Sequence, residues 1–384
     1  MSIKIDPYIK AAFSSFLEIY TGDPNRLSLK TKRVEDKYIK FFQELELDKD
    51  NEILLPKGGI AISYSYNGDI NIVLLGTSII EKDLNQFRDS NFCYMEDEGK
   101  NPALFLHLAK EFPSHLKLKK ENSSEAQVSN ILERSIEGDG YEFDILDIIS
   151  YHNDIYVFNI LNESTLAPQN LEEIIILLLI AFPSLLHSGD IEYLEIIKSI
   201  IDSEISNNTK YVDLGMMLQS ISAYYRRHTF LDIYRCLEKL FYFPEIYELS
   251  NKINTNEEKR LDVLTLKSIC SESLSWRPTE KDCIIKLLKV IFLDKELSFY
   301  DEASRKLCRD FFSKKIEKTN TEINDNQMVE EIAKYIYKYR NSLVHHEDKE
   351  YKNTIKKLTE EEWQQIACFI ANTLLRFSVK FRNF

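Results

Sequence analysis

The chain has 384 residues, of which 44% are hydrophobic and 12% aromatic. This length exceeds the usual size of one hydrophobic core, so two domains are expected, and the composition excludes a disordered chain. The formal net charge of −13 argues against a broad surface that coats nucleic acid, because such binding depends on clustered Lys and Arg. This charge does not exclude a local basic cleft within an acidic protein.

The six cysteines have no C-x-x-C spacing, so they indicate a reducing cytoplasm, and the sequence predicts no metal and no cofactor. The N-terminal residues lack the apolar core of a signal peptide. The most apolar run, 174–186, is interrupted by Pro183 and is too short to cross a bilayer. We therefore expect a cytoplasmic protein that does not contact a membrane.

The first part of the chain predicts a mixture of helices and strands. Asn67-Gly68 separates two runs rich in Ile, Val and Tyr, which is a strong signal for a two-residue hairpin. Periodicity and capping residues place the other elements. In chain order, the expected elements are helices over 8–20 and 32–47, strands over 59–66 and 69–76, and a helix over 104–111.

The next part continues this mixture, with a helix over 126–136, strands over 141–149 and 155–161, and an apolar helix from Leu171. This order loosely resembles the core of PD-(D/E)xK nucleases, with Asp144 at the place of the first metal ligand. Asn159-Ile160-Leu161 occupies the E-x-K positions and supplies neither the carboxylate nor the lysine. The sequence therefore favours a plain α+β sensing or scaffold domain over residues 1–209.

Strand signals disappear after residue 210, and the pattern predicts an all-α bundle over 210–384. Thr359 and Glu362 form a capping box at the start of the final helix, and Leu358 and Trp363 form a hydrophobic staple. Five helices are expected here, over 224–242, 283–293 and 297–315, from 326 onward, and over 359–381.

The helix from Asn326 carries the residues with the clearest chemistry. Its apolar positions recur at steps of three and four, which predicts one buried side. Arg340, Asn341, His345 and His346 follow within seven residues. Cleavage of RNA by its own 2′-hydroxyl needs a base, an acid and a cation for the charge that builds on phosphorus, and His and Arg can supply all three.

The segment Arg340-Asn341-Ser342-Leu343-Val344-His345 resembles the R-[N/D/H]-x(3–5)-H signature of HEPN domains. Its surroundings are similar to the Apea-type branch found in bacterial antiphage proteins. The resemblance implies a helical bundle, usually dimeric, that cleaves RNA without a metal as a toxin or defence effector. It also implies that Arg340 and His345 are catalytic and that Asn341 is supporting.

Two further residues are supporting candidates. His346 also fits a longer spacing of the motif, and we interpret it as a neighbour of the principal histidine. Glu238 lies late in the first bundle helix, where a glutamate is common in the Apea-type branch. A salt bridge to a nearby Lys or Arg explains Glu238 equally well, so both interpretations stay open.

Arg340 and His345 lie about 140° apart on an ideal helix, so a straight helix cannot aim both at one substrate. Either the helix ends or bends near Val344, or two copies of the motif meet across a dimer. A third interpretation is a plain helix end, where Arg and His are favourable beside free carbonyls. Because neither residue lies on the apolar stripe, truncation of either one is expected to cost little stability.

These observations predict a metal-independent endoribonuclease with RNA as substrate, acting as a homodimer through the bundle. The N-terminal domain is expected to respond to a phage-derived or host trigger. The alternative from another class is a catalytically silent HEPN-like module for dimerisation or ligand binding.

Overall fold

The structure is a computed structural model of the chain. It describes residues 36–116, 118, 127–128, 130, 145–152, 154–161, 171–207, 211–253, 263–270, 279–293, 325–344 and 358–381. Contacts divide the chain into two compact units, Met1–Leu186 and His187–Phe384. The helices expected over 8–20 and 297–315 lie outside the described residues.

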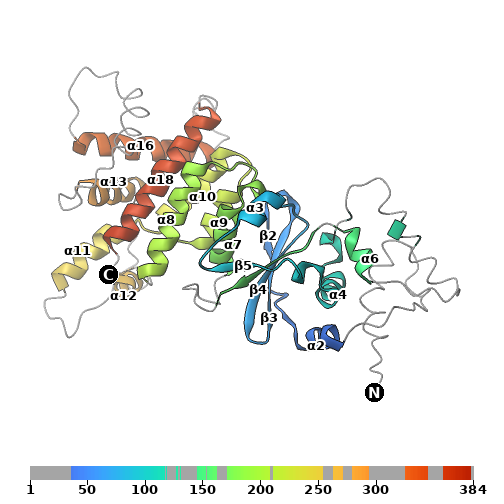
Figure 1. Ribbon diagram of the computed structural model, residues 1–384. Helices are drawn as coiled ribbons and strands as arrows, with labels where there is room; N and C mark the ends of the chain where they lie inside the picture. Colours follow the sequence, from blue (N-terminus) through green and yellow to red (C-terminus); the bar gives the residue numbers. More distant parts are fainter. Residues whose placement is uncertain are drawn as a thin grey trace. The chain divides into compact units, whose positions relative to one another are not determined.

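The first unit is built on an antiparallel sheet (Figure 1). Its strand order is β1-β3-β4-β6-β5, and β2 also pairs with β3. Every pairing within the sheet is antiparallel. The strands are β1 (Glu46–Leu47), β2 (Ile53–Leu54), β3 (Ile60–Tyr66), β4 (Asp69–Leu75), β5 (Phe92–Tyr94) and β6 (Tyr156–Ile160).

The hairpin between β3 and β4 confirms the turn predicted at Asn67-Gly68. Tyr66 pairs with Asp69, so the loop between the strands consists of Asn67 and Gly68 alone. Their φ angles are 53° and 87°, the left-handed values that a type I′ turn requires and that Asn and Gly tolerate best.

Both faces of the sheet are covered. On one face α2 (Asp36–Glu44), α4 (Pro102–Glu111) and α6 (Ile145–Ser150) share a core with alternate residues of β3 and β4. On the other face Phe158 of β6 packs against Phe87 and Phe182. These two residues follow α3 (Glu81–Gln86) and α7 (Leu171–Ala181). Short 3-10 turns complete the unit: η1 (Pro56–Gly58), η2 (Glu98–Lys100), η3 (Pro113–His115) and η4 (Pro183–Leu185).

Two predictions for this unit were wrong, one in where a helix ends and one in the type of an element. The end of the helix expected over 32–47 is strand β1. The strand expected over 141–149 is the helix α6 where the chain is described. Within α6, Ile148 is fully buried but Leu146 is 46% exposed. This difference contradicts a strand, in which residues two apart share a face.

The second unit is helical among its described residues, which makes the chain an α+β protein with its sheet in the N-terminal part, as the sequence predicted. α18 packs against α8 and α10, and α13 packs against α16 (Figure 1). The bundle has more helices than the sequence predicted. They are α8 (Ile191–Asn207), α9 (Leu214–Ser222), α10 (Arg226–Glu238), α11 (Phe243–Ile253), α12 (Val263–Ser268), α13 (Glu280–Phe292), α16 (Asp325–Val344) and α18 (Glu360–Lys380).

The final helix begins where its capping residues predict. The Thr359 hydroxyl accepts a hydrogen bond from the Glu362 backbone at 3.1 Å, and the Glu362 carboxylate accepts one from the Thr359 backbone at 2.9 Å. The predicted apolar stripe of this helix is completely buried and comprises Ile366, Ile370, Leu374, Phe377 and Phe381. α18 is therefore the central element of the bundle.

The contacts divide the chain at residue 187, whereas the sequence placed the boundary after residue 209. α8 belongs to the helical unit because it packs against α18 and α9. The Tyr193 hydroxyl of α8, for example, lies 2.8 Å from the Ser220 hydroxyl of α9.

Across the described parts of both units, no helix combines the length and the apolar character that a membrane crossing requires. Helix α7, which contains part of the apolar run 174–186, is 11 residues long and ends before Pro183.

Candidate active site around Arg340

The buried side of α16 fixes the position of Arg340. Ile332, Ile336 and Tyr339 of the predicted stripe are buried, whereas its other members are only partly buried, namely Met328, Tyr335 and Leu343. The Tyr339 ring lies edge-on to the Trp363 ring of α18, with 5.8 Å between the ring centroids. Arg340 is the next residue along α16, so its side chain projects from the helix at the edge of this packed face.

The Arg340 guanidinium contacts three side chains. Its Nη2 lies 3.0 Å from Glu238 Oε1, and its Nε lies 3.2 Å from Glu280 Oε1. Its Nη1 donates to Asn341 Oδ1 at 3.1 Å. Because the guanidinium is planar and all three of its nitrogens are engaged, its orientation is fixed.

The ends of three helices supply these groups. Glu238 is the last residue of α10, Glu280 is the first residue of α13, and Arg340 lies in the last turns of α16. A carboxylate at a helix N-terminus and a cation near a helix C-terminus both suit the helix dipole. Glu280 is also oriented by the Tyr234 hydroxyl, which donates to its Oε1 at 2.8 Å.

The cluster is only partly exposed to solvent. The side chains of Arg340, Glu238 and Glu280 are 21%, 29% and 27% exposed. Burial raises the pKa of Glu238 above its ordinary value, the Arg340 charge lowers it, and the Glu280 charge raises it again. Burial, followed by the Glu280 charge, also raises the pKa of Tyr234. One guanidinium thus faces two carboxylates, and the ionised cluster has a charge of −1.

Arg340 keeps some capacity for a ligand. A guanidinium has five N–H donors, and the contacts above use three of them. Two donors remain, and a phosphate oxygen is an acceptor to which arginine forms strong charge-assisted hydrogen bonds. The arrangement can therefore place one anionic oxygen beside Arg340, provided that this oxygen competes with the two carboxylates.

The structure brings three of the predicted site residues together, namely Arg340, Asn341 and Glu238. Glu238 forms a salt bridge with Arg340, as the second interpretation expects, and its role at an active site stays a prediction. Asn341 is buried. His345 and His346 lie outside the described residues, so their positions relative to Arg340 stay predictions.

Glu280 was missed by the sequence analysis. It lies 60 residues before Arg340, and the sequence around it indicates only a chain break followed by an apolar helix. An acidic residue in the first turn of a helix is common for dipole reasons alone, so no local signal distinguishes it. Only the packing of α13 against α16 reveals its role.

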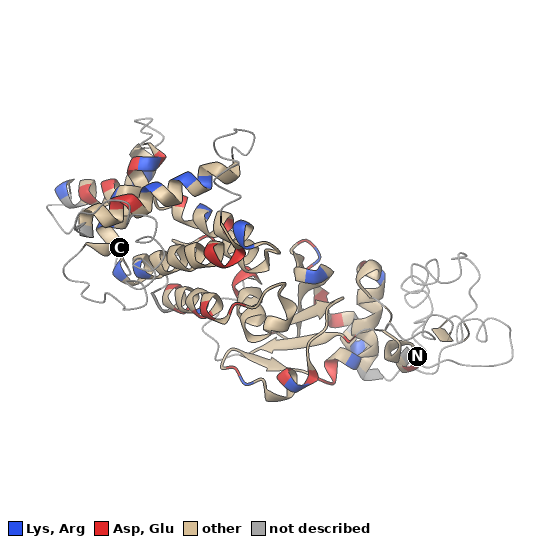
Figure 2. Cartoon of the chain, turned by 90° about the horizontal axis from the view of Figure 1, so that it is seen from above, with Lys and Arg blue, Asp and Glu red and all other residues tan. Residues whose placement is uncertain are grey.

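The charges of the helical unit are mixed. Figure 2 shows Lys and Arg interleaved with Asp and Glu along its helices. Any attraction for an anion at Arg340 is therefore local.

Among the described residues, no three His, Cys, Asp or Glu side chains are grouped so that they could hold a metal ion.

Comparison with known proteins gave no match to this chain among family models, curated protein sequences or solved structures.

Proposed function

We propose that the chain is a metal-independent endoribonuclease of the HEPN type, acting in the cytoplasm as a toxin or antiphage effector. The observation that supports this proposal is the fixed guanidinium of Arg340, which sits one residue before Asn341 and five before His345 and keeps two N–H donors. A preoriented cation is what a charged phosphorane transition state requires.

The proposed reaction is attack of a ribose 2′-hydroxyl on the neighbouring phosphate. A base takes the 2′ proton, the bond from phosphorus to the 5′ oxygen breaks, and an acid protonates that oxygen. His345 is one of the two proton-transfer groups, and Arg340 stabilises the charge on phosphorus. Asn341, Glu238 and Glu280 orient the guanidinium. The products are a 2′,3′-cyclic phosphate and a 5′-hydroxyl.

The second candidate function is a catalytically silent HEPN-like module for dimerisation or ligand binding. The two carboxylates beside Arg340 favour this silent module, because they neutralise the positive charge that would otherwise attract a phosphate. In that case Arg340 joins three helix ends and has no substrate. The experiment that separates the two functions is an RNA cleavage assay with the purified chain in EDTA, since only the first function predicts product.

A dimer is part of the proposal, because the reaction needs a second proton-transfer group and about 140° separates Arg340 from His345 on a straight helix. We expect Arg340→Ala and His345→Ala chains, each inactive alone, to recover part of the wild-type cleavage rate when mixed. Cleavage rates of the separate and mixed variants, with light scattering to determine mass, test this. A fully active monomer would contradict the composite site.

The N-terminal unit then has a regulatory role. A ribonuclease that acts on cellular RNA harms its own cell, so its activity needs restraint until a phage-derived or host signal arrives. We propose that the unit built on the β1–β6 sheet receives that signal.

A further inference from the structure

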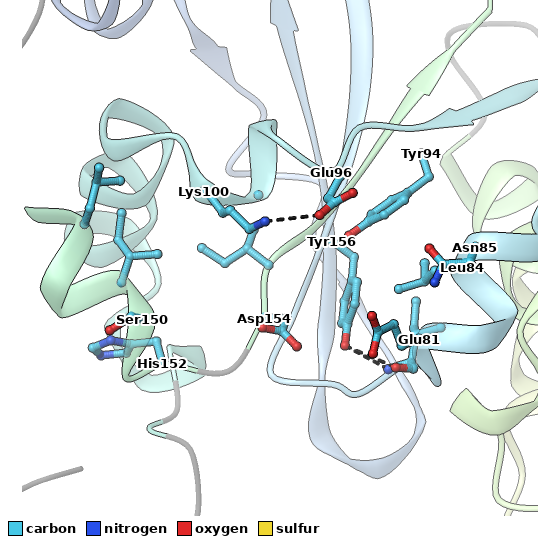
Figure 3. Close-up of a pocket in the computed structure, with 15 residues that line it drawn as sticks. Glu81, Leu84, Asn85, Tyr94, Glu96, Lys100, Ser150, His152, Asp154 and Tyr156 are labelled. Atoms are coloured by element: carbon cyan, nitrogen blue, oxygen red, sulfur yellow. Dashed lines mark hydrogen bonds and ion pairs between the residues drawn. The ribbon is translucent and has the colours of Figure 1, made fainter.

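The N-terminal unit contains a cavity of about 630 Å³, drawn in Figure 3. Its lining comes from α3, β5, η2, α6 and the start of β6, all within one unit. Cavities of about 300–1,000 Å³ are typical of sites for small molecules. This volume is therefore large enough for a metabolite but not for a folded partner.

Part of the cavity lining is apolar and aromatic. Tyr94 and Tyr156 line it together with aliphatic side chains such as Ile79 and Leu84 (Figure 3). The Tyr156 hydroxyl accepts a hydrogen bond from the Ile79 backbone at 3.0 Å, which fixes its ring. The Tyr94 ring packs on Phe158, with 5.5 Å between the ring centroids. Both rings are thus held by the core of the unit.

The wall of the cavity is rigid at Gly99. A Cβ atom at this position would lie 2.2 Å from the carbonyl oxygen of Ile155, so η2 approaches the start of β6 as closely as a backbone can. Gly99 and Ile155 both line the cavity. The contact between η2 and the start of β6 therefore leaves no room for a larger residue at position 99 of the cavity wall.

The charged groups of the cavity are mainly acidic. Glu81, Glu96 and Asp154 line it, and Lys100 is the one lysine or arginine among its lining residues. The Lys100 ammonium lies 3.2 Å from the Glu96 carboxylate. Three carboxylates and one ammonium leave a charge of −2 beside the two tyrosines. Burial, followed by the charges of Glu96, Tyr156 and Asp154, raises the pKa of Tyr94 to about 12.

From the cavity and its lining we propose that this site binds a small aliphatic amine or quaternary ammonium compound. The cationic group lies against the Tyr94 ring and pairs with Asp154 and Glu96, and its aliphatic body contacts Tyr156 and Ile79. A cation over a tyrosine ring gains electrostatic attraction from the ring, and the gain grows as water is excluded. An anion is disfavoured by the charge of the site.

Calorimetric titration of the full chain tests this proposal with three probes: putrescine, choline and the neutral 1,4-butanediol. We expect saturable 1:1 binding of at least one cation, weaker binding at high salt, and no binding of the diol. Tighter binding of putrescine indicates a primary amine, and tighter binding of choline indicates a quaternary one.

The double variant Glu96→Gln, Asp154→Asn keeps the shape of the cavity and removes two charges. We expect it to bind the cation at least about tenfold more weakly. Tyr94→Leu is expected to weaken binding as well, because it keeps the apolar bulk but removes the ring. Glu52→Gln is the matched control, since Glu52 is an exposed carboxylate of the same unit outside the cavity lining.

Circular dichroism of each variant shows whether it folds. The proposal is overturned if neither cation binds saturably to the folded wild-type chain. It is equally overturned if the diol binds as tightly as the cations, or if the folded double variant binds them as tightly as Glu52→Gln does.

Discussion

Replacing Arg340 with alanine is expected to destabilise the protein by about 1–3 kcal/mol and to reduce RNA cleavage by at least about a hundredfold. The sequence alone predicted a small cost in stability, because Arg340 lies off the apolar stripe. The contacts of Arg340 lead us to expect a larger cost. Without the guanidinium, Glu238 and Glu280 remain close together at 29% and 27% exposure with no cation between them.

The cost of Arg340→Ala should depend on pH. Burial raises the pKa of Glu238 already in the wild type, and loss of the Arg340 charge raises it further. A carboxyl whose pKa is raised on folding binds its proton more tightly in the native state, so it lowers stability as pH rises through that pKa. The difference between variant and wild type is therefore largest near neutral pH and shrinks on acidification toward the ordinary value of 4.5.

Urea unfolding at several pH values measures this difference. Arg340→Lys should recover part of the stability but little of the cleavage, since one ammonium cannot contact both carboxylates and a phosphate in a single plane. Arg235→Ala is the control, because Arg235 is 46% exposed and its one ion pair within the described part of the chain is with Asp232 of its own helix. A loss in Arg340→Ala no larger than in Arg235→Ala would show that the cluster contributes nothing to stability.

Replacing His345 with alanine is expected to slow RNA cleavage by about 10²–10⁴-fold, which is the usual contribution of a general acid or base. Stability should change little, since the residue lies beyond the stripe of α16. We also expect induction of the wild-type chain to arrest growth and induction of His345→Ala not to do so. Cleavage rates, growth curves and the unfolding midpoint are the measurements.

His115→Ala is the control for this variant, because His115 lies in η3 of the N-terminal unit and its ring lies within hydrogen-bond distance of the neighbouring Ser114 hydroxyl. It should cleave RNA at the wild-type rate. Wild-type cleavage by folded His345→Ala would remove this histidine from the proposed mechanism.

Local signals in the sequence predicted those parts of the fold in which neighbouring residues determine the conformation. The hairpin at Asn67-Gly68 and the capping box at Thr359 both depend on contacts within four residues. The stripe of α18 was predicted equally well, since a period of three to four leaves one continuous apolar face. Mixed α+β architecture followed from these elements.

The failures have a different cause, because tertiary contacts decided them. The run Ile145–Ile149 is rich in β-branched residues, which favour strands, yet Ile148 packs into the core beneath α4 as part of a helix. Glu280 was missed for the same reason, since it meets Arg340 only through the packing of α13 against α16. Segments far apart in the chain determine both features.

The most direct test of RNA cleavage at Arg340 is an analysis of fragment ends. Purified wild-type chain is incubated with single-stranded RNA in EDTA, and the new 3′ and 5′ ends are identified. We predict cleavage that EDTA does not reduce, with 2′,3′-cyclic phosphate and 5′-hydroxyl ends, and none from folded His345→Ala. Loss of cleavage on chelation that Mg²⁺ restores, or 5′-phosphate ends, would contradict the proposed reaction.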